Sequence, residues 1–281
     1  MQTYIIMLGA IIGDIAGSTF EFDNVKTKDF PLFAEGSSFT DDTICSIAVA
    51  EWLLEDPTHT LEGLEKKLVE LGMAFPYPMG GYGKTFSTWL FHPRYLRDCD
   101  TEEKLKGRKP YHSCGNGSAM RVSAVGWYFD TLEETERVAG ISAEVTHNHP
   151  EGIKGAQAVA AAIFMARTGA KKNAINAYIE EKYGYNLHRT CDDIRPTYIF
   201  ADSCPHTVPP AIIAFLESTD FEDAIRLAIS LGGDSDTIAC MTGGIAEAYY
   251  KKIPQRLVDV AWEMLPERFK KVVNTIGTLR Q

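Results

Sequence analysis

Apolar side chains recur every three or four residues along most of this 281-residue chain. This spacing places them on one face of an α-helix, so it predicts an all-α protein. The pattern covers Asp41–Leu54, Leu61–Ala74, Met120–Phe129, Leu132–Val145, Gly152–Arg167, Ala174–Tyr183, Pro209–Leu216, Phe221–Ser230, Thr237–Lys251 and Gln255–Leu265, with a further turn or two after Pro266. Strand-like alternation is limited to Thr197–Ala201. Because no series of strands exists, we do not expect an α/β sheet.

The chain begins with an apolar stretch, MQTYIIMLGAIIGDIAGS, which contains Asp14 and lacks the basic flank of a signal peptide. We interpret it as a buried first helix, since no apolar run reaches the roughly 18 to 20 residues that span a bilayer. Small residues crowd this stretch and the later segments GAQAVAAA and TGGIAEA, which favours close helix packing. No fixed-period repeat or linker divides residues 1–281, so we expect one compact domain.

The charge balance limits the partners that the chain is expected to have. It carries 38 acidic and 28 basic residues, a net charge of -10, and general nucleic-acid binding needs the opposite sign. The six cysteines form no CxxC pair, which favours reduced thiols in a cytoplasmic protein. They are Cys45, Cys99, Cys114, Cys191, Cys204 and Cys240, of which Cys45 and Cys240 are expected to be buried. We expect no membrane partner and favour a monomer.

Two acidic clusters stand at the starts of two apolar helices and share the ending Asp-Thr-Ile. The first contains Thr40, Asp41, Asp42 and Thr43, and the second contains Asp234, Ser235, Asp236 and Thr237. Helix capping is one interpretation, because Asp, Ser and Thr are preferred at helix starts. Capping uses one or two oxygens, however, and each cluster offers two carboxylates and at least one hydroxyl, which are costly to bury unpaired. Two Mg²⁺ or Mn²⁺ ions between the clusters would remove this cost, whereas no His-rich or Cys-rich set suggests zinc.

Two glycine-rich segments are candidates for anion binding. The first, Ser113–Arg121, runs from Gly115, Asn116, Gly117 and Ser118 into a helix, where free backbone N–H groups suit a phosphate. The alternative is an ordinary Gly/Asn turn with Ser118 as the cap. The second, within the loop Phe75–Thr85, contains Gly81, Tyr82 and Gly83, and together the two suggest a pyrophosphate cradle.

Two further polar residues are candidates for the site. Glu21 follows the first apolar helix and is either a solvated loop acid or, beside bound metals, a general acid or base. His147 and His149 precede Pro150 with a spacing that suits a turn, so we expect His147 to form hydrogen bonds rather than to bind a metal.

These motifs together resemble the ADP-ribosylglycohydrolase family, which includes the dinitrogenase-reductase-activating glycohydrolases and the vertebrate ADP-ribosyl-acceptor hydrolases. The matching stretches are GAIIGDIAGSTFEF, FTDDT, GGYGKTF, CGNGSAMR, VTHNHPEGIKGA, TVPPAI and SLGGDSDTIACMTGGIAEAYY, in the family's order over most of the chain. The resemblance implies a compact all-helical fold with two Mg²⁺ or Mn²⁺ ions in a central cleft. It implies that Thr40, Asp41 and Asp42 hold one ion. It implies that Asp234, Asp236 and Thr237 hold the other, with Asp236 bridging.

The resemblance also implies the remaining roles. Glu21 matches a catalytic glutamate of one branch of the family, the loop CGNGS from Cys114 to Ser118 matches a diphosphate-binding loop, and His147 matches a ligand-contacting histidine. Cys114 stands where many relatives have an aromatic residue, so the resemblance does not carry a stacking contact over to that position.

The expected function is metal-dependent hydrolysis of the glycosidic bond between ADP-ribose and an acceptor, releasing ADP-ribose. One alternative is a metal-dependent phosphoesterase acting on a nucleotide, which would release AMP instead. Another is a non-catalytic ADP-ribose-binding protein, since a fold does not fix a function. We expect acceptor selection to depend on the loop Asn186–Pro210 and on Tyr82, with Tyr198 a candidate to stack on adenine.

Overall fold

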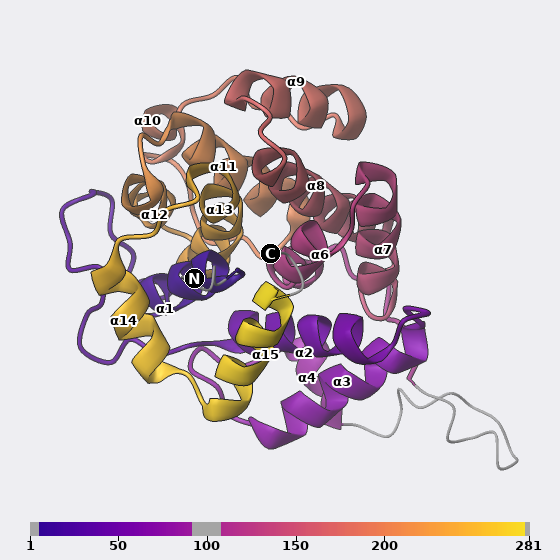
Figure 1. Cartoon of the computed structure of the whole chain (residues 1–281). Helices are drawn as coiled ribbons and strands as arrows, with labels where there is room; N and C mark the ends of the chain where they lie inside the picture. The colour runs from indigo at the N-terminus through magenta and orange to yellow at the C-terminus, as the bar shows by residue number, and fades with distance from the viewer. Residues whose placement is uncertain (1–5, 92–107, 279–281) are drawn as a thin grey trace, which may run out of the picture.

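The computed structural model describes residues 6–91 and 108–278, and the regular secondary structure of these segments is helical (Figure 1). The helices are α1 (Leu8–Gly17), α2 (Asp41–Glu55), α3 (Leu61–Ala74), α4 (Lys84–Phe91), α5 (Gly117–Met120), α6 (Ser123–Tyr128), α7 (Leu132–Glu144), α8 (Pro150–Arg167), α9 (Lys172–Tyr183), α10 (Cys191–Ile194), α11 (Cys204–Glu217), α12 (Phe221–Ser230), α13 (Ser235–Tyr250), α14 (Gln255–Met264) and α15 (Glu267–Thr278). Within these described segments there is no strand, and isolated bridges join Thr40 to Met79 and Gly115 to Ser203. The predicted all-α class is therefore confirmed.

The structure corrects the predicted helix boundaries at several points. The segment Met120–Phe129 is not one helix but is divided between α5 and α6. The break lies at Arg121 and Val122, whose ψ angles are near zero. The buried guanidinium of Arg121 donates hydrogen bonds to Ser142 O and Thr146 Oγ1, and these bonds favour the break over a continuous helix. Thr197–Ala201 forms no strand.

Other differences come from helices that the spacing did not reveal. α4 was not predicted. The segment Asn186–Pro210, expected to be a long loop, contains α10 and the first turns of α11, so Pro209 and Pro210 lie inside α11. α15 has 12 residues instead of a turn or two. Arg268 of this helix donates from Nε and from a terminal nitrogen to the two carboxylate oxygens of Glu51 on α2, at 2.6 Å each, which stabilises the extra turns.

Helix α1 is buried at every residue and lies between α13 and α2 (Figure 1). Three glycines spaced four apart permit its close contact with α13. A Cβ atom at Gly13 would lie 2.0 Å from the carbonyl oxygen of Ala239, and one at Gly9 would lie 2.4 Å from that of Gly243. At Gly17 a Cβ would lie 2.4 Å from Cα of Asp236. Because side chains are missing here, Asp14 comes close to the start of α13.

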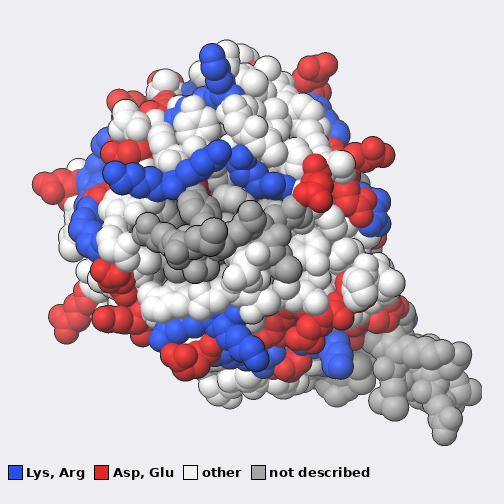
Figure 2. All heavy atoms as spheres, viewed as in Figure 1, with Lys and Arg blue, Asp and Glu red and all other residues white. Residues whose placement is uncertain are grey.

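None of the described helices is both long enough and apolar enough to cross a membrane. The surface bears charges of both signs. On the face drawn in Figure 2, acidic and basic side chains are interspersed around the edge. Five cysteines are free thiols, and Cys45 and Cys240 are buried as predicted, whereas Cys99 lies outside the described residues.

Glu247 of α13 is a buried carboxyl that faces the start of α1, where it accepts a hydrogen bond of 3.0 Å from Gly9 N. Burial raises its pKa to about 8, although the adjoining backbone N–H groups oppose the shift. An acid whose pKa is raised on folding stabilises the protein fully below its unfolded pKa. That contribution is lost as the pH rises to about 8. We therefore expect the melting temperature of Glu247→Gln, relative to that of the wild type, to increase as the pH is raised from 5 to 8.5.

Thermal unfolding of both proteins across this range tests the expectation, with Glu263→Gln as the control because Glu263 is exposed on α14. A constant difference between wild type and Glu247→Gln at all pH values would contradict it.

Candidate active site

A cavity of about 370 Å³ collects residues from the starts of α2, α5 and α13 and from the loops after α1 and α3. All predicted site residues except Thr40 and Ser118 line it. The lining ones are Glu21, Asp41, Asp42, Gly81, Tyr82, Gly83, Ser113, Gly115, Asn116, Gly117, His147, Asp234, Asp236 and Thr237. Segments separated by more than 200 positions in the sequence therefore meet at one place.

The first acidic cluster forms the start of α2. Thr40 caps this helix, with its Oγ1 accepting from Asp42 N at 3.2 Å, so part of the cluster does serve as a helix cap. Asp42 is 1% exposed, and its Oδ2 accepts from Thr237 Oγ1 at 3.1 Å. Its Oδ1 is buried without a hydrogen-bond partner. Capping thus accounts for Thr40 but leaves an oxygen of Asp42 unsatisfied.

The second cluster forms the start of α13. Gly232 and Gly233 precede it with φ near +73°, a conformation that favours glycine, and turn the chain into the helix. Asp234 accepts from Asn116 Nδ2 at 2.7 Å, while Asp236 in the first turn is 3% exposed. The contact between Thr237 and Asp42 joins this cluster to the first.

Asp14 is a member of the same acidic group that sequence reasoning did not assign to the site. It lies in α1, fully buried, and its carboxylate accepts from the backbone N–H and the hydroxyl of both Thr40 and Thr43. Burial nevertheless raises the pKa of Asp14 to about 6. The signal that could have found it is an acid inside an otherwise apolar helix, because such a charge needs partners.

The carboxylates form two overlapping groups in which the oxygens lie within 4.8 Å of one another. One group is Asp14, Asp42 and Asp236, and the other is Glu21, Asp234 and Asp236. The position of Asp236 in both groups agrees with the bridging role that the resemblance implies. The grouping differs from the implied ligand sets because Asp14 joins Asp42, Glu21 joins Asp234, and Thr40 donates to Asp14 Oδ1 instead of facing the cavity.

The electrostatics of the cluster favour a bound cation. Burial, followed by repulsion from neighbouring carboxylates, raises the pKa of Asp41, Asp42 and Asp236 well above the usual range. Divalent ions such as Mg²⁺ and Mn²⁺ prefer oxygen ligands of this type and would reverse the unfavourable interactions. Such ions fit the site, because Oδ1 of Asp42 has no hydrogen-bond partner. They also fit because both groups contain only Asp and Glu, with no His or Cys ligand.

Glu21 occupies the loop after α1, at the edge of the acidic group. Burial raises its pKa to about 7, and the carboxylates of Asp234 and Asp14 add to the shift. Gly80 lies so close to Glu21 that a Cβ atom on Gly80 would be 2.7 Å from Glu21 Oε2. The φ of Gly80, +73°, also favours glycine. Near neutral pH this side chain is therefore poised to give or to take a proton.

The glycine-rich turn before α5 lies on the cavity but is partly engaged by the protein. The backbone N–H of Asn116 donates to Asp202 O at 2.8 Å, and that of Gly115 donates to Ser113 Oγ at 2.9 Å. Ser118 Oγ donates to Gly152 O at 2.8 Å, so Ser118 neither faces the cavity nor caps α5.

His147 lies against this turn. A Cβ atom at Gly117 would be 3.0 Å from its Cε1 and Nε2 atoms, and its Nδ1 is 2.7 Å from Thr146 Oγ1. Burial and the nearby charge of Arg121 hold the pKa of His147 well below its usual range, so the imidazole is neutral. The hydrogen bond that was expected for His147 is present.

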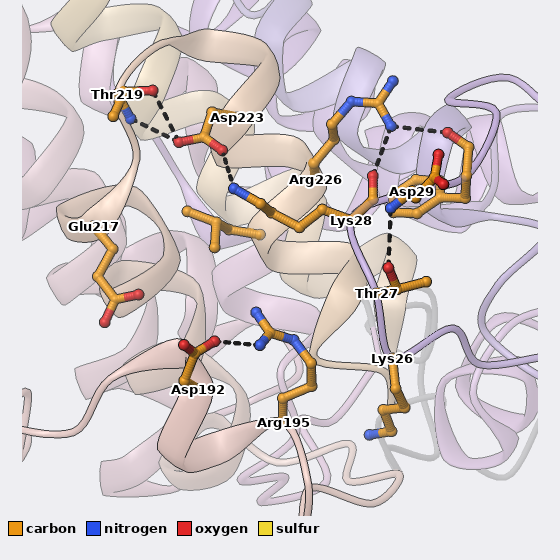
Figure 3. Close-up of a pocket in the computed structure, with 12 residues that line it drawn as sticks. Lys26, Thr27, Lys28, Asp29, Asp192, Arg195, Glu217, Thr219, Asp223 and Arg226 are labelled. Atoms are coloured by element: carbon orange, nitrogen blue, oxygen red, sulfur yellow. Dashed lines mark hydrogen bonds and ion pairs between the residues drawn. The ribbon is translucent and has the colours of Figure 1, made fainter.

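A larger cavity of about 910 Å³ lies between α10, α12 and residues 26–30 (Figure 3). Two ion pairs line it, with Lys28 2.7 Å from Asp223 and Arg195 bonded to Asp192. Arg226 donates to the carbonyl oxygens of Lys28 and Phe30. The smaller cavity differs because it holds buried carboxylates that repel one another.

The chain is similar in sequence and in fold to known proteins of one family. The sequence pattern of the family described as ADP-ribosylglycohydrolase matches residues 5–277. The chain is 25% identical to ADP-ribosylhydrolase ARH3 of Gallus gallus over 98% of this chain and 91% of that protein. It is 24% identical to ADP-ribosylarginine hydrolase Tri1 of Pseudomonas putida (strain GB-1) over 91% of this chain and 73% of that protein. A solved structure described as an ADP-ribosylglycohydrolase-related protein complex matches its fold with a TM-score of 0.71 and 24% identity, covering 98% of this chain and 96% of the other.

Proposed function

Because the chain belongs to the ADP-ribosylglycohydrolase family, we propose that it hydrolyses the glycosidic bond between ADP-ribose and an acceptor, with the help of two Mg²⁺ or Mn²⁺ ions. The observation that carries this proposal is the convergence of Asp42, Asp234 and Asp236 with Glu21 in one cavity, with the buried carboxylate of Asp14 close to Asp42 and Asp236. The names of two relatives, ADP-ribosylhydrolase ARH3 and ADP-ribosylarginine hydrolase Tri1, support the proposal that this bond is the one cleaved.

The metal ions would be held by the two carboxylate groups, with Asp236 shared between them. Bound there, the cations would neutralise the carboxylates and supply a Lewis-acid anchor for the ribose hydroxyls. Asp14 also accepts four hydrogen bonds, which fix Thr40 and Thr43 at the start of α2 and so orient Asp41 and Asp42.

In the reaction, the bond from the ribose C1 to the acceptor breaks and a bond from C1 to a water oxygen forms, through an oxocarbenium-like state. Glu21 takes a proton from the attacking water or gives one to the departing acceptor, and its pKa of about 7 suits either role. The turn at Gly115–Gly117 and the neutral His147 are proposed to contact the diphosphate. Gly81, Tyr82 and Gly83 are proposed to close the cavity over the substrate from the loop before α4.

Release of free ADP-ribose from ADP-ribosylated peptides tests the proposal. We expect turnover with Mg²⁺ or Mn²⁺ present, loss of turnover with EDTA, and recovery when excess metal is returned. AMP as the product would instead favour a phosphoesterase, and tight ADP-ribose binding without turnover on any acceptor would favour a binding protein. Activity that EDTA leaves unchanged would contradict the metal requirement.

A further inference from the structure

Two aromatic side chains stand exposed at the mouth of the active-site cavity. Phe22 is 75% exposed and Phe200 is 49% exposed, although both line the cavity. Their ring planes are inclined by 18° with centroids 6.4 Å apart. Ile199, beside Phe200, is 77% exposed. Large apolar groups gathered at a cavity mouth are typical of a surface that binds a ligand, because their exposure to water is otherwise unfavourable.

Both segments that carry the rings are fixed by polar side chains. Asn24 donates from Nδ2 to the carbonyl oxygens of Phe20, Glu21 and Gly233, and its Oδ1 accepts from Gly233 N at 2.7 Å. These bonds tie the backbone beside Phe22 to the turn before α13.

Lys26, at the margin of the larger cavity in Figure 3, performs the same task for the second segment. Its ammonium group donates to Tyr198 O at 2.8 Å and to Leu231 O. Asn116 N also holds Asp202 O at 2.8 Å, so Phe200 lies between two fixed points. The backbone segments that carry the two rings are therefore held in place before any ligand binds.

We propose that Phe22 and Phe200 bind the acceptor part of the substrate and select for a flat acceptor group, an inference that rests on the proposed glycosidase function. Phe22 directly follows Glu21, the residue proposed to exchange a proton at the bond that breaks. The ring thus lies where the departing group must leave the cavity.

The charge at this mouth narrows the chemistry of the acceptor. Asp202 is an exposed acid that lines the cavity two residues after Phe200, exposed Lys84 lines it too, and the chain as a whole carries a net charge of -10. Aromatic faces and carboxylates together favour a planar cation such as a guanidinium, which stacks on rings and is attracted to the acids. An acceptor that offers a single hydroxyl gains neither interaction.

The experiment compares wild type with Phe22→Ala, Phe200→Ala and the control Tyr77→Ala. Tyr77 is 95% exposed but does not line the cavity. Steady-state hydrolysis is measured with one peptide ADP-ribosylated on arginine and one ADP-ribosylated on serine. Affinity for free ADP-ribose, which lacks an acceptor, is measured by calorimetry, and melting temperatures establish that each variant is folded.

We expect each Phe variant to lower kcat/KM on the arginine peptide by roughly 10-fold, mainly through KM, with a smaller loss on the serine peptide. Affinity for ADP-ribose should change less than about twofold, and Tyr77→Ala should behave as wild type. An equal loss of ADP-ribose affinity would assign the rings to the adenosine end and overturn the inference. Unchanged kcat/KM, equal losses on both peptides, or wild-type turnover of the serine peptide alone would also overturn it. Failure of the wild type to release ADP-ribose from either peptide would instead count against the proposed function.

Discussion

Replacing Asp236 with asparagine is expected to lower kcat/KM by at least about 100-fold, because this carboxylate belongs to both acidic groups. Loss of an outer partner of a metal ligand already costs about 10- to 100-fold, and a ligand shared between two ions should cost more. Asparagine keeps the size of the side chain and removes one charge. Because the neighbouring carboxylates repel Asp236, the metal-free variant should melt at or above the temperature of the metal-free wild type.

Steady-state rates at saturating Mn²⁺, together with melting temperatures in EDTA, separate loss of function from loss of fold. Asp192→Asn is the matched control, since Asp192 is exposed and lines only the larger cavity. Asp236→Asn with activity near that of the wild type would remove Asp236 from the proposed ligands.

The second large effect is expected from Glu21→Gln, which should lower kcat by about 10²- to 10⁴-fold, the range typical of a general acid or base. The amide cannot exchange the proton, while the size of the side chain beside Gly80 is kept. We expect affinity for ADP-ribose to be retained within a few-fold, because the glutamine still fits the same loop.

Single-turnover rates and calorimetric binding of ADP-ribose test this prediction. Glu35→Gln serves as the control, because Glu35 is an exposed acid that does not line the cavity. A Glu21→Gln variant whose kcat stays within twofold of wild type would show that another group moves the proton.

Sequence reasoning was most successful where the pattern was local. Three- and four-residue spacing predicted α3 at its observed bounds, and the acidic starts of α2 and α13 were recognised from neighbouring residues. α4 was missed because its first residues continue a glycine-rich loop. α15 was too short in the prediction because its pairing with Glu51 on α2 is not visible in its own sequence.

The features that the sequence did not reveal depend on contacts between distant segments. Asp14 is an isolated acid in an apolar helix until α1 packs against α2 and brings it to Thr40 and Thr43. Phe22 and Phe200 are separated by most of the chain and meet only at the cavity mouth. The backbone N–H of Asn116, expected to be free for an anion, is used by Asp202. Periodicity in a single sequence contains none of these pairings.

Acids from α1, α2 and α13 are proposed to hold paired divalent ions, and Mn²⁺ titration of EDTA-stripped protein tests this arrangement most directly. Electron paramagnetic resonance counts free and bound ions without any substrate. We expect saturable binding of about two ions per chain in the wild type, and loss of at least one of them in Asp236→Asn. Wild-type protein that binds no Mn²⁺, or an Asp236→Asn variant that binds as the wild type does, would contradict the account.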